Sequence, residues 1–533
     1  MGATKSWTRD EVAVRILAGE HLIVFNGHLL RIPSSWLDAH PGGALAILHF
    51  VGRDASDEIE AYHLDQTLTL IPRYSVGRVE LTDDAWQPLV PPVMSGWVRK
   101  PSADGKSTEW FSEAAPQRSA VDTSLSPSSQ ILLVSKDDND CHAAPDRAAL
   151  EPPPTSLSLK VQTNHSQAYK LLHKRIVDAG LYKTPYLTGY GPEVLRYILL
   201  GCLSAYAYHH SWFITSSVFL GLMWHQLVFS AHDLGHMGVT HNWAIDRLLS
   251  ILIADFIGGL SIGWWVENHN IHHIVTNHPS HDPDIEHLPF FAISSAFLSS
   301  LWSSYYKRTM WFDRFAKIFV AIQHRLFYIV MLFARFNLYA NSYTYLYKKA
   351  FDTRRARGGR WAWGLEVIGL AFFWWWFGRV LYGCGSWQTA LAYLLVSHAV
   401  TSPLHVQIVL SHFSMSTADL GPTESFPHRQ LRTTSDVICD ESIGFIHGGL
   451  HLQVTHHLFP RLPRHNLKRA SALVKEFAQE QGLTYAEFGF FDGNAEVIGV
   501  LRGVAEQVKL MGKVANVEAK EAIEKRLAQK KFT

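Results

Sequence analysis

The chain has 533 residues, enough for two or three domains. Its 48 Lys and Arg residues nearly balance its 47 Asp and Glu residues, so the net charge gives no support to a nucleic-acid partner. The four cysteines lie far apart in sequence, which argues against a disulfide framework and against a cysteine-ligated zinc or iron–sulfur site. The 30 histidines are a high number, and many of them occur in short clusters.

The chain changes character along its length. Residues 1–95 have the composition of a soluble module, and we expect no cleaved signal peptide there. Residues 96–184 are predicted to be a disordered linker and an amphipathic lead-in, because 101–165 is rich in Ser, Pro and Asp and has little periodicity. Residues 185–490 contain long, aromatic-rich apolar runs, and 491–533 is a charged stretch that is expected to form a helical tail.

Four of the apolar runs are near or above the roughly 17–25 residues that a membrane helix needs. They are 194–209, 211–230, 362–383 and 387–410. Two hairpins made of these runs would place the head, the histidine clusters and the tail on one side of the membrane. The weaker apolar segments 248–266 and 291–340 are then expected to lie in the interface or to re-enter it.

The head contains two histidines in a pattern that suits a haem. His40 opens the sequence HPGG, whose proline and glycines form a tight turn without bulky side chains, so that a flat ligand can come close. His63 follows in the same stretch. Two neutral imidazoles on opposite faces of a haem iron fill both axial positions and suit electron transfer. The alternative is a turn with two ordinary surface histidines.

Three further histidine clusters lie in the apolar half, each at the end of an apolar run. HDLGH and HNIHH place their histidines three or four residues apart, on one face of a helix. GGLHLQVTHH repeats the second spacing, with a glutamine in the first place, whose amide oxygen binds iron more weakly than an imidazole. The residues concerned are His232 and His236, then His269, His272 and His273, and then Gln453, His456 and His457.

Matching clusters of this kind are hard to explain by packing, because polar residues beside membrane helices are costly and usually functional. Imidazole-rich sites suit iron, zinc or copper, and a redox haem in the same chain favours iron. Eight other histidines near the clusters fall outside the pattern and are expected to support the ligands, line the substrate path or lie on the surface. They are His241, His278, His281, His287, His405, His447, His451 and His465.

Residues 6–80 resemble a cytochrome b5 domain over its whole length, from SWTRDEVAVRI through HPGG to YSVGRVE. With the three histidine boxes and the glutamine that opens the third, the chain resembles the fused front-end membrane desaturases and is most similar to fungal sphingolipid Delta-8 desaturases. The resemblance covers 1–95 and about 185–490. It implies an α+β cytochrome b5-like haem domain followed by an all-α polytopic membrane desaturase domain, with about four transmembrane helices plus interfacial helices.

The resemblance also implies the ligands of haem b and of two non-haem iron ions. Haem b would lie between His40 and His63. The iron ligands carry over to His232, His236, His269, His272, His273, His456 and His457, with Gln453 as the weak member. Desaturases of this kind take one more histidine from the helix before the third box, and His412 is the candidate for it. Some relatives have an asparagine four residues earlier, where this chain has Ile408.

By resemblance, the reaction is the O2-dependent removal of two hydrogens from an unactivated lipid chain, which gives a double bond and water. Electrons would pass from an NADH–cytochrome b5 reductase through the haem to the irons. The expected product carries a Delta-8 double bond in the long-chain base of a ceramide or another sphingolipid. The alternatives are a front-end fatty acyl desaturase acting at Delta-5 or Delta-6, a cytochrome b5-fused lipid hydroxylase, and a membrane electron-transfer or metal-binding protein without turnover.

The final residues predict the cellular location. The chain ends in KKFT, which resembles a dilysine retrieval signal that is read in the cytosol. We therefore expect a multi-pass protein of the endoplasmic reticulum membrane, with the haem domain, the histidine boxes and the C-terminus in the cytosol.

Overall fold

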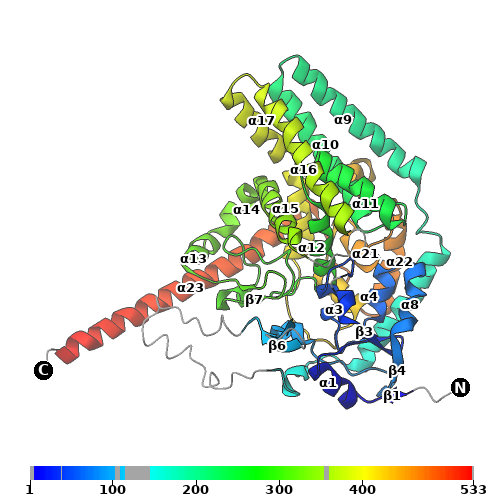
Figure 1. Ribbon diagram of the computed structural model, residues 1–533. Coiled ribbons are helices and arrows are strands. Elements are labelled where there is room, and N and C mark those ends of the chain that lie inside the picture. The colour runs from blue at the N-terminus through cyan, green and yellow to red at the C-terminus, as the bar shows by residue number, and fades with distance from the viewer. Residues whose placement is uncertain (1–4, 38, 103–107, 115–143, 353–358, 531–533) are drawn as a thin grey trace.

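A computed structural model describes residues 5–37, 39–102, 108–114, 144–352 and 359–530 (Figure 1). The head is an α+β unit, as predicted, built on a four-stranded sheet with the order β1-β4-β3-β2. Strands β1 and β4 run parallel, and the other pairs are antiparallel. Its elements are β1 (Ser6–Trp7), α1 (Arg9–Leu17), β2 (His21–Phe25), β3 (His28–Ile32), α2 (Ser34–Leu37), α3 (Leu45–Leu48), α4 (Ser56–Tyr62), α5 (Asp65–Leu68), η1 (Ile71–Tyr74) and β4 (Ser75–Val79).

The segment predicted to be a disordered linker contains ordered elements. A hairpin forms from β5 (Trp97–Pro101) and β6 (Thr108–Ser112), and a short helix forms at η3 (Ala148–Leu150). A further short helix, η2 (Pro92–Ser95), ends the segment predicted to be the head. Leu150 belongs to the core of the head, and Arg147 forms ion pairs with Asp10 and Glu151. The structure therefore differs from the prediction in these parts, because apolar and charged side chains fix them to the head. Residues 103–107 and 115–143 of the predicted linker lie outside the described residues.

The apolar half is helical, as predicted, and is preceded by α8 (Leu159–Asp178), which lies in the predicted lead-in. Among the residues that the structure describes, three helical stretches are long and apolar enough to cross a membrane, and two sharply bent helix pairs bring the number to five if each pair is one span. The predicted number of about four lies in this range. The three are α10 (Phe213–Gly235), α16 (Gly359–Tyr382), and α17 (Trp387–Ala399) continued by α18 (Ser402–Phe413).

The predicted run 194–209 lies in α9 (Gly191–His209), which is not among these three spans. This helix begins with a short π-helical segment, η4 (Tyr186–Tyr190), and its first turns carry Glu193 and Arg196. It packs along α10 as a hairpin and exposes an apolar face that includes Leu195, Ile198 and Leu199. Such an exposed apolar face suits contact with lipid.

The two bent pairs occupy the segments that were predicted to lie in the interface or to re-enter. One pair bends by 113° between 243–257 and 262–274, and the other bends by 92° between 314–320 and 323–332. The elements of this region are α11 (Trp243–Ile251), η5 (Leu252–Ile257), α12 (Ile262–Ile274), η6 (Ser295–Ser299), β7 (Trp302–Ser303), β8 (Arg308–Thr309), α13 (Arg314–Val320), α14 (Gln323–Leu332) and α15 (Ala334–Ala350).

The C-terminal part of the chain, from residue 426 on, follows the membrane helices. Its elements are α19 (Phe426–Thr433), β9 (Asp436–Ile438), η7 (Glu441–Ile443), α20 (Gly444–His447), α21 (Gln453–Leu458), η8 (Arg464–Asn466), α22 (Leu467–Glu480), β10 (Glu487–Gly489) and α23 (Phe490–Lys530). The first half of α23 buries Val497, Leu501 and Val504 against α13, α14 and α18, whereas its second half projects away from the rest of the molecule (Figure 1). The last three residues of KKFT lie outside the described residues.

The order of the layers places the histidine boxes between the head and the membrane helices. Helices α9, α10, α16 and α17 stand together at one end of the molecule, and the head lies at the other end (Figure 1). Helices α12 and α21, which carry the second and third boxes, lie between them (Figure 1). The boxes therefore lie close to the head as well as at the ends of apolar helices.

Candidate metal centres

The rings of His40 and His63 lie close together in the head. Their ring centres are 6.0 Å apart. Two imidazoles on opposite sides of a metal, each with its nitrogen at about 2 Å, have ring centres separated by roughly this distance. The Nδ1 atoms of His40 and His63 lie 3.2 and 2.9 Å from the carbonyl oxygens of Gly43 and Ile59, so each ring turns its Nε2 atom away from the main chain. Burial lowers the pKa of His40 to about 4, which keeps this imidazole neutral at pH 7.

The histidines of the boxes form two buried groups in which the ligand atoms lie within 4.8 Å of one another. The first group joins the first box to one histidine from each of the other two boxes. The second group contains the candidate from the helix before the third box. The members are His232, His236, His269 and His456 in the first group, and His272, His412 and His457 in the second.

Two predicted ligands lie beside these groups rather than within them. The Nε2 atom of His273 is 3.0 Å from that of His269, and its ring stacks on His457 with the centres 4.0 Å apart, so His273 lies between the two groups. Gln453 is at the start of α21 and is 2% exposed. Its Oε1 atom is buried and has no hydrogen-bond partner among the described residues.

Several other buried donor atoms of the groups also lack a hydrogen-bond partner within the described parts of the chain. They are the Nε2 atoms of His236, His412, His456 and His457, and Nδ1 of His273. Burying an unpaired polar atom is costly, and so many in one place indicate that a ligand satisfies them. Burial and the neighbouring imidazoles lower the pKa values of His456 and His457 well below the ordinary value, which keeps both in the neutral form that binds metals. The residues therefore fit imidazole-bound metal ions such as iron.

Side chains outside the boxes orient the ligands of the second group. Asp282 lies 2.9 Å from Nδ1 of His272, and the side-chain oxygen of Gln430 lies 3.0 Å from Nδ1 of His457. The carbonyl oxygen of Thr433 is 3.4 Å from Nδ1 of His412. Hydrogen bonds of this kind fix the tautomer and the ring orientation of a metal ligand. Each of these rings therefore turns Nε2 toward the others.

The first box is held by a buried ion pair. Asp233, next to His232, accepts hydrogen bonds at 2.6 Å from Arg464 and at 2.6 Å from Tyr190. Arg464 also contacts Glu193 at the start of α9. This network ties the end of α10 to the segment after the third box, and so it fixes two boxes relative to each other.

The supporting residues Asp233, Asp282, Gln430 and Arg464 were not predicted from the sequence. Asp233 lies inside HDLGH, and Asp282 lies in the acid-rich stretch HDPDIEH directly after the second box, so both had a local signal. Gln430 comes from α19 and Arg464 from η8, and neither had such a signal.

The eight other histidines near the boxes stay outside both groups in the described chain. Several of them bind other residues: Nε2 of His241 lies 2.8 Å from the carbonyl oxygen of Tyr182, Nδ1 of His447 lies 2.7 Å from Gln407, and Nε2 of His465 lies 3.1 Å from Glu193. Ile408 packs against an apolar cluster around Phe229 and offers no ligand.

Comparison with known proteins agrees with this architecture. The fatty acid desaturase family model matches residues 209–489, and the cytochrome b5-like haem/steroid binding domain model matches residues 8–80. A Delta 8-(E)-sphingolipid desaturase of Emericella nidulans is 43% identical over 95% of both chains. One from Komagataella phaffii is 43% identical over 95% of this chain and 94% of its own. A Delta(8)-fatty-acid desaturase of Helianthus annuus is 35% identical over 64% of this chain and 74% of its own. The chain therefore belongs to the fatty acid desaturase family, with a cytochrome b5-like haem domain fused ahead of the desaturase domain.

Proposed function

We propose that this enzyme introduces a Delta-8 double bond of E geometry into the long-chain base of ceramide or a related sphingolipid. The observation that carries the proposal is the pair of buried imidazole groups beside a two-histidine haem site. The substrate class comes from the fungal relatives, which are named for this reaction and match this chain over nearly its whole length. For the same reason, we favour this reaction over formation of a cis double bond, desaturation of a fatty acyl chain, and hydroxylation.

The proposed cofactors are haem b, held by His40 and His63, and two iron ions held by the two groups. His232, His236, His269 and His456 would hold one iron, and His272, His412 and His457 would hold the other. His273, which lies between the two groups, and Gln453, whose buried side-chain oxygen has no partner among the described residues, would complete the set. When bound, the irons supply the O2 chemistry that breaks unactivated C–H bonds, which no side chain achieves by acid–base chemistry.

The residues of the chain prepare the site for this chemistry. Burial keeps His456 and His457 neutral, Asp282 and Gln430 orient His272 and His457, and the burial of the ligands limits access of bulk water. In the overall reaction the lipid loses two hydrogen atoms, and O2 takes these together with two electrons and two protons to give two water molecules. The electrons would come from NADH through a cytochrome b5 reductase and the haem of the head.

We further propose that the protein lies in the endoplasmic reticulum membrane with the head, the boxes and the C-terminus in the cytosol. The grouping of α9, α10, α16 and α17 at the end away from the head supports one shared side for the head and the boxes (Figure 1). The domain limits proposed from the sequence are 1–95, 96–184, 185–490 and 491–533.

The test is lipid analysis of a yeast-like host without this unsaturation, by mass spectrometry that locates double bonds. We expect a new Delta-8 E double bond in the long-chain base in cells that express the chain, and none in cells that express His456→Ala. New unsaturation only in fatty acyl chains would replace the sphingolipid substrate by an acyl substrate. A hydroxylated lipid without a double bond would make the enzyme a hydroxylase.

A further inference from the structure

The head packs against the helix that carries the second histidine box. Ile47 and Phe50 of the head form one buried cluster with Ile271, Ile274 and Val275, which lie at the end of α12. Domains joined by a linker move relative to each other by default unless their interface is large and apolar. A buried apolar cluster shared by the two domains therefore opposes such motion.

The turn that carries the haem ligand His40 also touches α12. A Cβ atom on Gly42 would lie 3.5 Å from the side chain of Asn270, and one on Gly43 would lie 3.2 Å from that of Glu267. The two glycines therefore allow the turn that carries His40 to approach α12 closely. Asn270 directly follows His269 of the second box, so this turn contacts the same helix that carries the histidines of the second box.

Tyr62 lies between the haem ligand His63 and the box histidine His273. It immediately precedes the haem ligand His63, and its ring meets the ring of His273 edge to face, with the centres 6.2 Å apart. It packs against the apolar cluster on α12 and also against the cluster that contains α21 and α22. Its hydroxyl is buried and has no hydrogen-bond partner among the described residues, so the ring makes the contacts.

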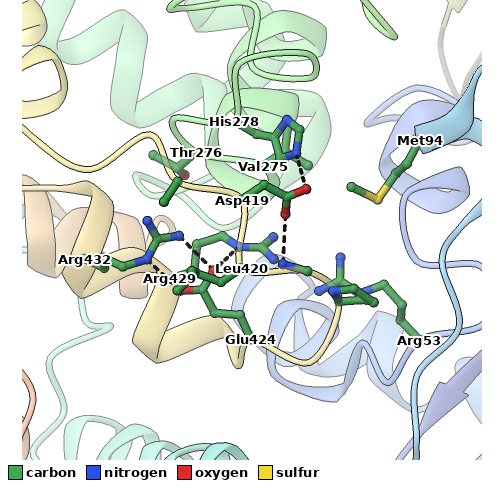
Figure 2. Close-up of a pocket in the computed structure, with 13 residues that line it drawn as sticks. Arg53, Met94, Val275, Thr276, His278, Asp419, Leu420, Glu424, Arg429 and Arg432 are labelled. Atoms are coloured by element: carbon green, nitrogen blue, oxygen red, sulfur yellow. Dashed lines mark hydrogen bonds and ion pairs between the residues drawn. The ribbon is translucent and has the colours of Figure 1, made fainter. Parts of the chain in front are cut away.

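Polar contacts also join the head to the desaturase domain. Nε of Arg461, which follows the third box, donates a 3.3 Å hydrogen bond to the carbonyl oxygen of Ala61. Arg53 of the head is 3% exposed and lines a cavity of about 20 Å³, which has room for a water molecule. Asp419 and Glu424 of the desaturase domain line the same cavity (Figure 2). Burial and the nearby Arg429 lower the pKa of Arg53 to about 10, and the two carboxylates offset part of this effect. The head is therefore held mainly by apolar packing and by the hydrogen bond of Arg461.

We propose that the head is a fixed part of the desaturase, docked with its haem side on the second box, and that Tyr62 is the positioning residue that sets the distance between His63 and His273. The proposal rests on the proposed function, because it assigns the geometry of the electron donor. In each transfer, a ferrous haem held by His40 and His63 would give one electron to a ferric iron held by the box histidines, so that the first would become ferric and the second ferrous. Tyr62 itself is neither oxidised nor reduced.

The first test measures the distance between the domains without using activity. A spin label is attached to a cysteine introduced at the exposed Glu480 of α22, in a chain whose Cys141, Cys202 and Cys439 are serine, and pulsed electron paramagnetic resonance gives its distance from the ferric haem. The protein is first stripped of non-haem iron, and the haem is retained. A docked head gives one narrow distance distribution, whereas a broad distribution would overturn the proposal even if the lipid assay shows desaturation.

Variants of Tyr62 test whether its ring positions the head on the desaturase domain. Tyr62→Phe keeps the ring and should leave the distance distribution unchanged, whereas Tyr62→Ala should shift or broaden it while the haem absorbance stays. In iron-loaded protein, the oxidation of reduced haem should slow by about tenfold to a hundredfold in Tyr62→Ala, as expected for a loss of precise positioning. Tyr74→Ala is the matched control, since Tyr74 packs on Trp36 within the head. An unchanged distance in Tyr62→Ala, or an equal loss in Tyr62→Phe, would refute positioning by the ring.

Discussion

The haem site and the proposed iron site use the same side chain but are built by different means. His40 and His63 come from one short stretch of the head, and main-chain carbonyl oxygens orient both rings. The box histidines come from α10, α12, α18 and α21, and side chains far away in sequence orient several of them. The haem site therefore depends on a small local fold, whereas the iron site depends on the packing of the whole desaturase domain.

The strongest way to test this comparison is to remove one ligand from each site. We expect His456→Ala to lose bound non-haem iron and all Delta-8 product while the haem absorbance stays. His40→Ala should lose the haem and the product while the non-haem iron stays. The measurements are non-haem iron and haem content per protein, with lipid analysis of the same cells.

His447→Ala is the control for these changes, because His447 lies shortly before the third box but binds Gln407 and belongs to neither group. It should keep both cofactors. Normal iron content in His456→Ala, or normal haem content after both His40→Ala and His63→Ala, would refute the corresponding ligand assignment.

Removal of an orienting side chain should have a smaller effect and only at the iron site. Asp282→Ala leaves the ring of His272 without the carboxylate that fixes it, and the loss of such a partner typically costs about 10–100-fold in metal affinity. Asp282→Asn keeps an acceptor oxygen and should lie between the wild type and Asp282→Ala. Iron binding is measured by titration of iron-free protein. An unchanged affinity in Asp282→Ala would show that His272 is oriented by other contacts.

The same contrast explains what the sequence could predict. The architecture, an α+β haem domain followed by a helical membrane domain, is confirmed, because the HPGG turn and the apolar runs are local patterns. Spacings of three and four residues place the histidines of a box on one helix face, so each box could be recognised alone. How the boxes combine could not be predicted. His269 and His272 lie on one face of α12, yet the first joins His232 and the second joins His412.

The remaining features depend on long-range packing. Gln430 orients His457 only because α19 lies beside α21, and nothing around residue 430 indicates this. The contact between the head and α12 is of the same kind, since Phe50 and Ile271 are ordinary apolar residues in sequence. Order in part of the predicted linker was also missed, because it comes from contacts with the head such as those of Leu150.

The pH should change the stability of the region around the third box and not that of the haem site. Burial raises the pKa of Asp436, which accepts a hydrogen bond from the backbone of Val454, from 3.8 to about 7. The folded protein therefore holds a proton that the unfolded chain releases, and this contribution to stability is fully present below pH 3.8 and is lost as the pH rises through about 7.

Asp436→Asn cannot ionise, so it should be more stable relative to the wild type at pH 8 than at pH 5.5. The difference should be about 2 kcal/mol, since about 1.5 pH units separate pH 5.5 from a pKa of about 7 and one unit corresponds to about 1.4 kcal/mol. The measurement is the unfolding midpoint of iron-free protein in detergent at both pH values, with haem absorbance as an internal comparison. An equal difference at both pH values would contradict the raised pKa.

The smallest effect is expected where the boxes differ in sequence. Gln453 holds the place in the third box that His269 holds in the second, and its side-chain oxygen is buried without a partner among the described residues. Gln453→His restores the spacing of the second box and supplies an imidazole, so iron content should stay near that of the wild type. Gln453→Leu, which fills similar space without a donor atom, should bind iron more weakly. If Gln453→His instead lost as much iron as His456→Ala, the position would tolerate only an amide, and Gln453 would be a principal ligand or spacer rather than a weak member of the set.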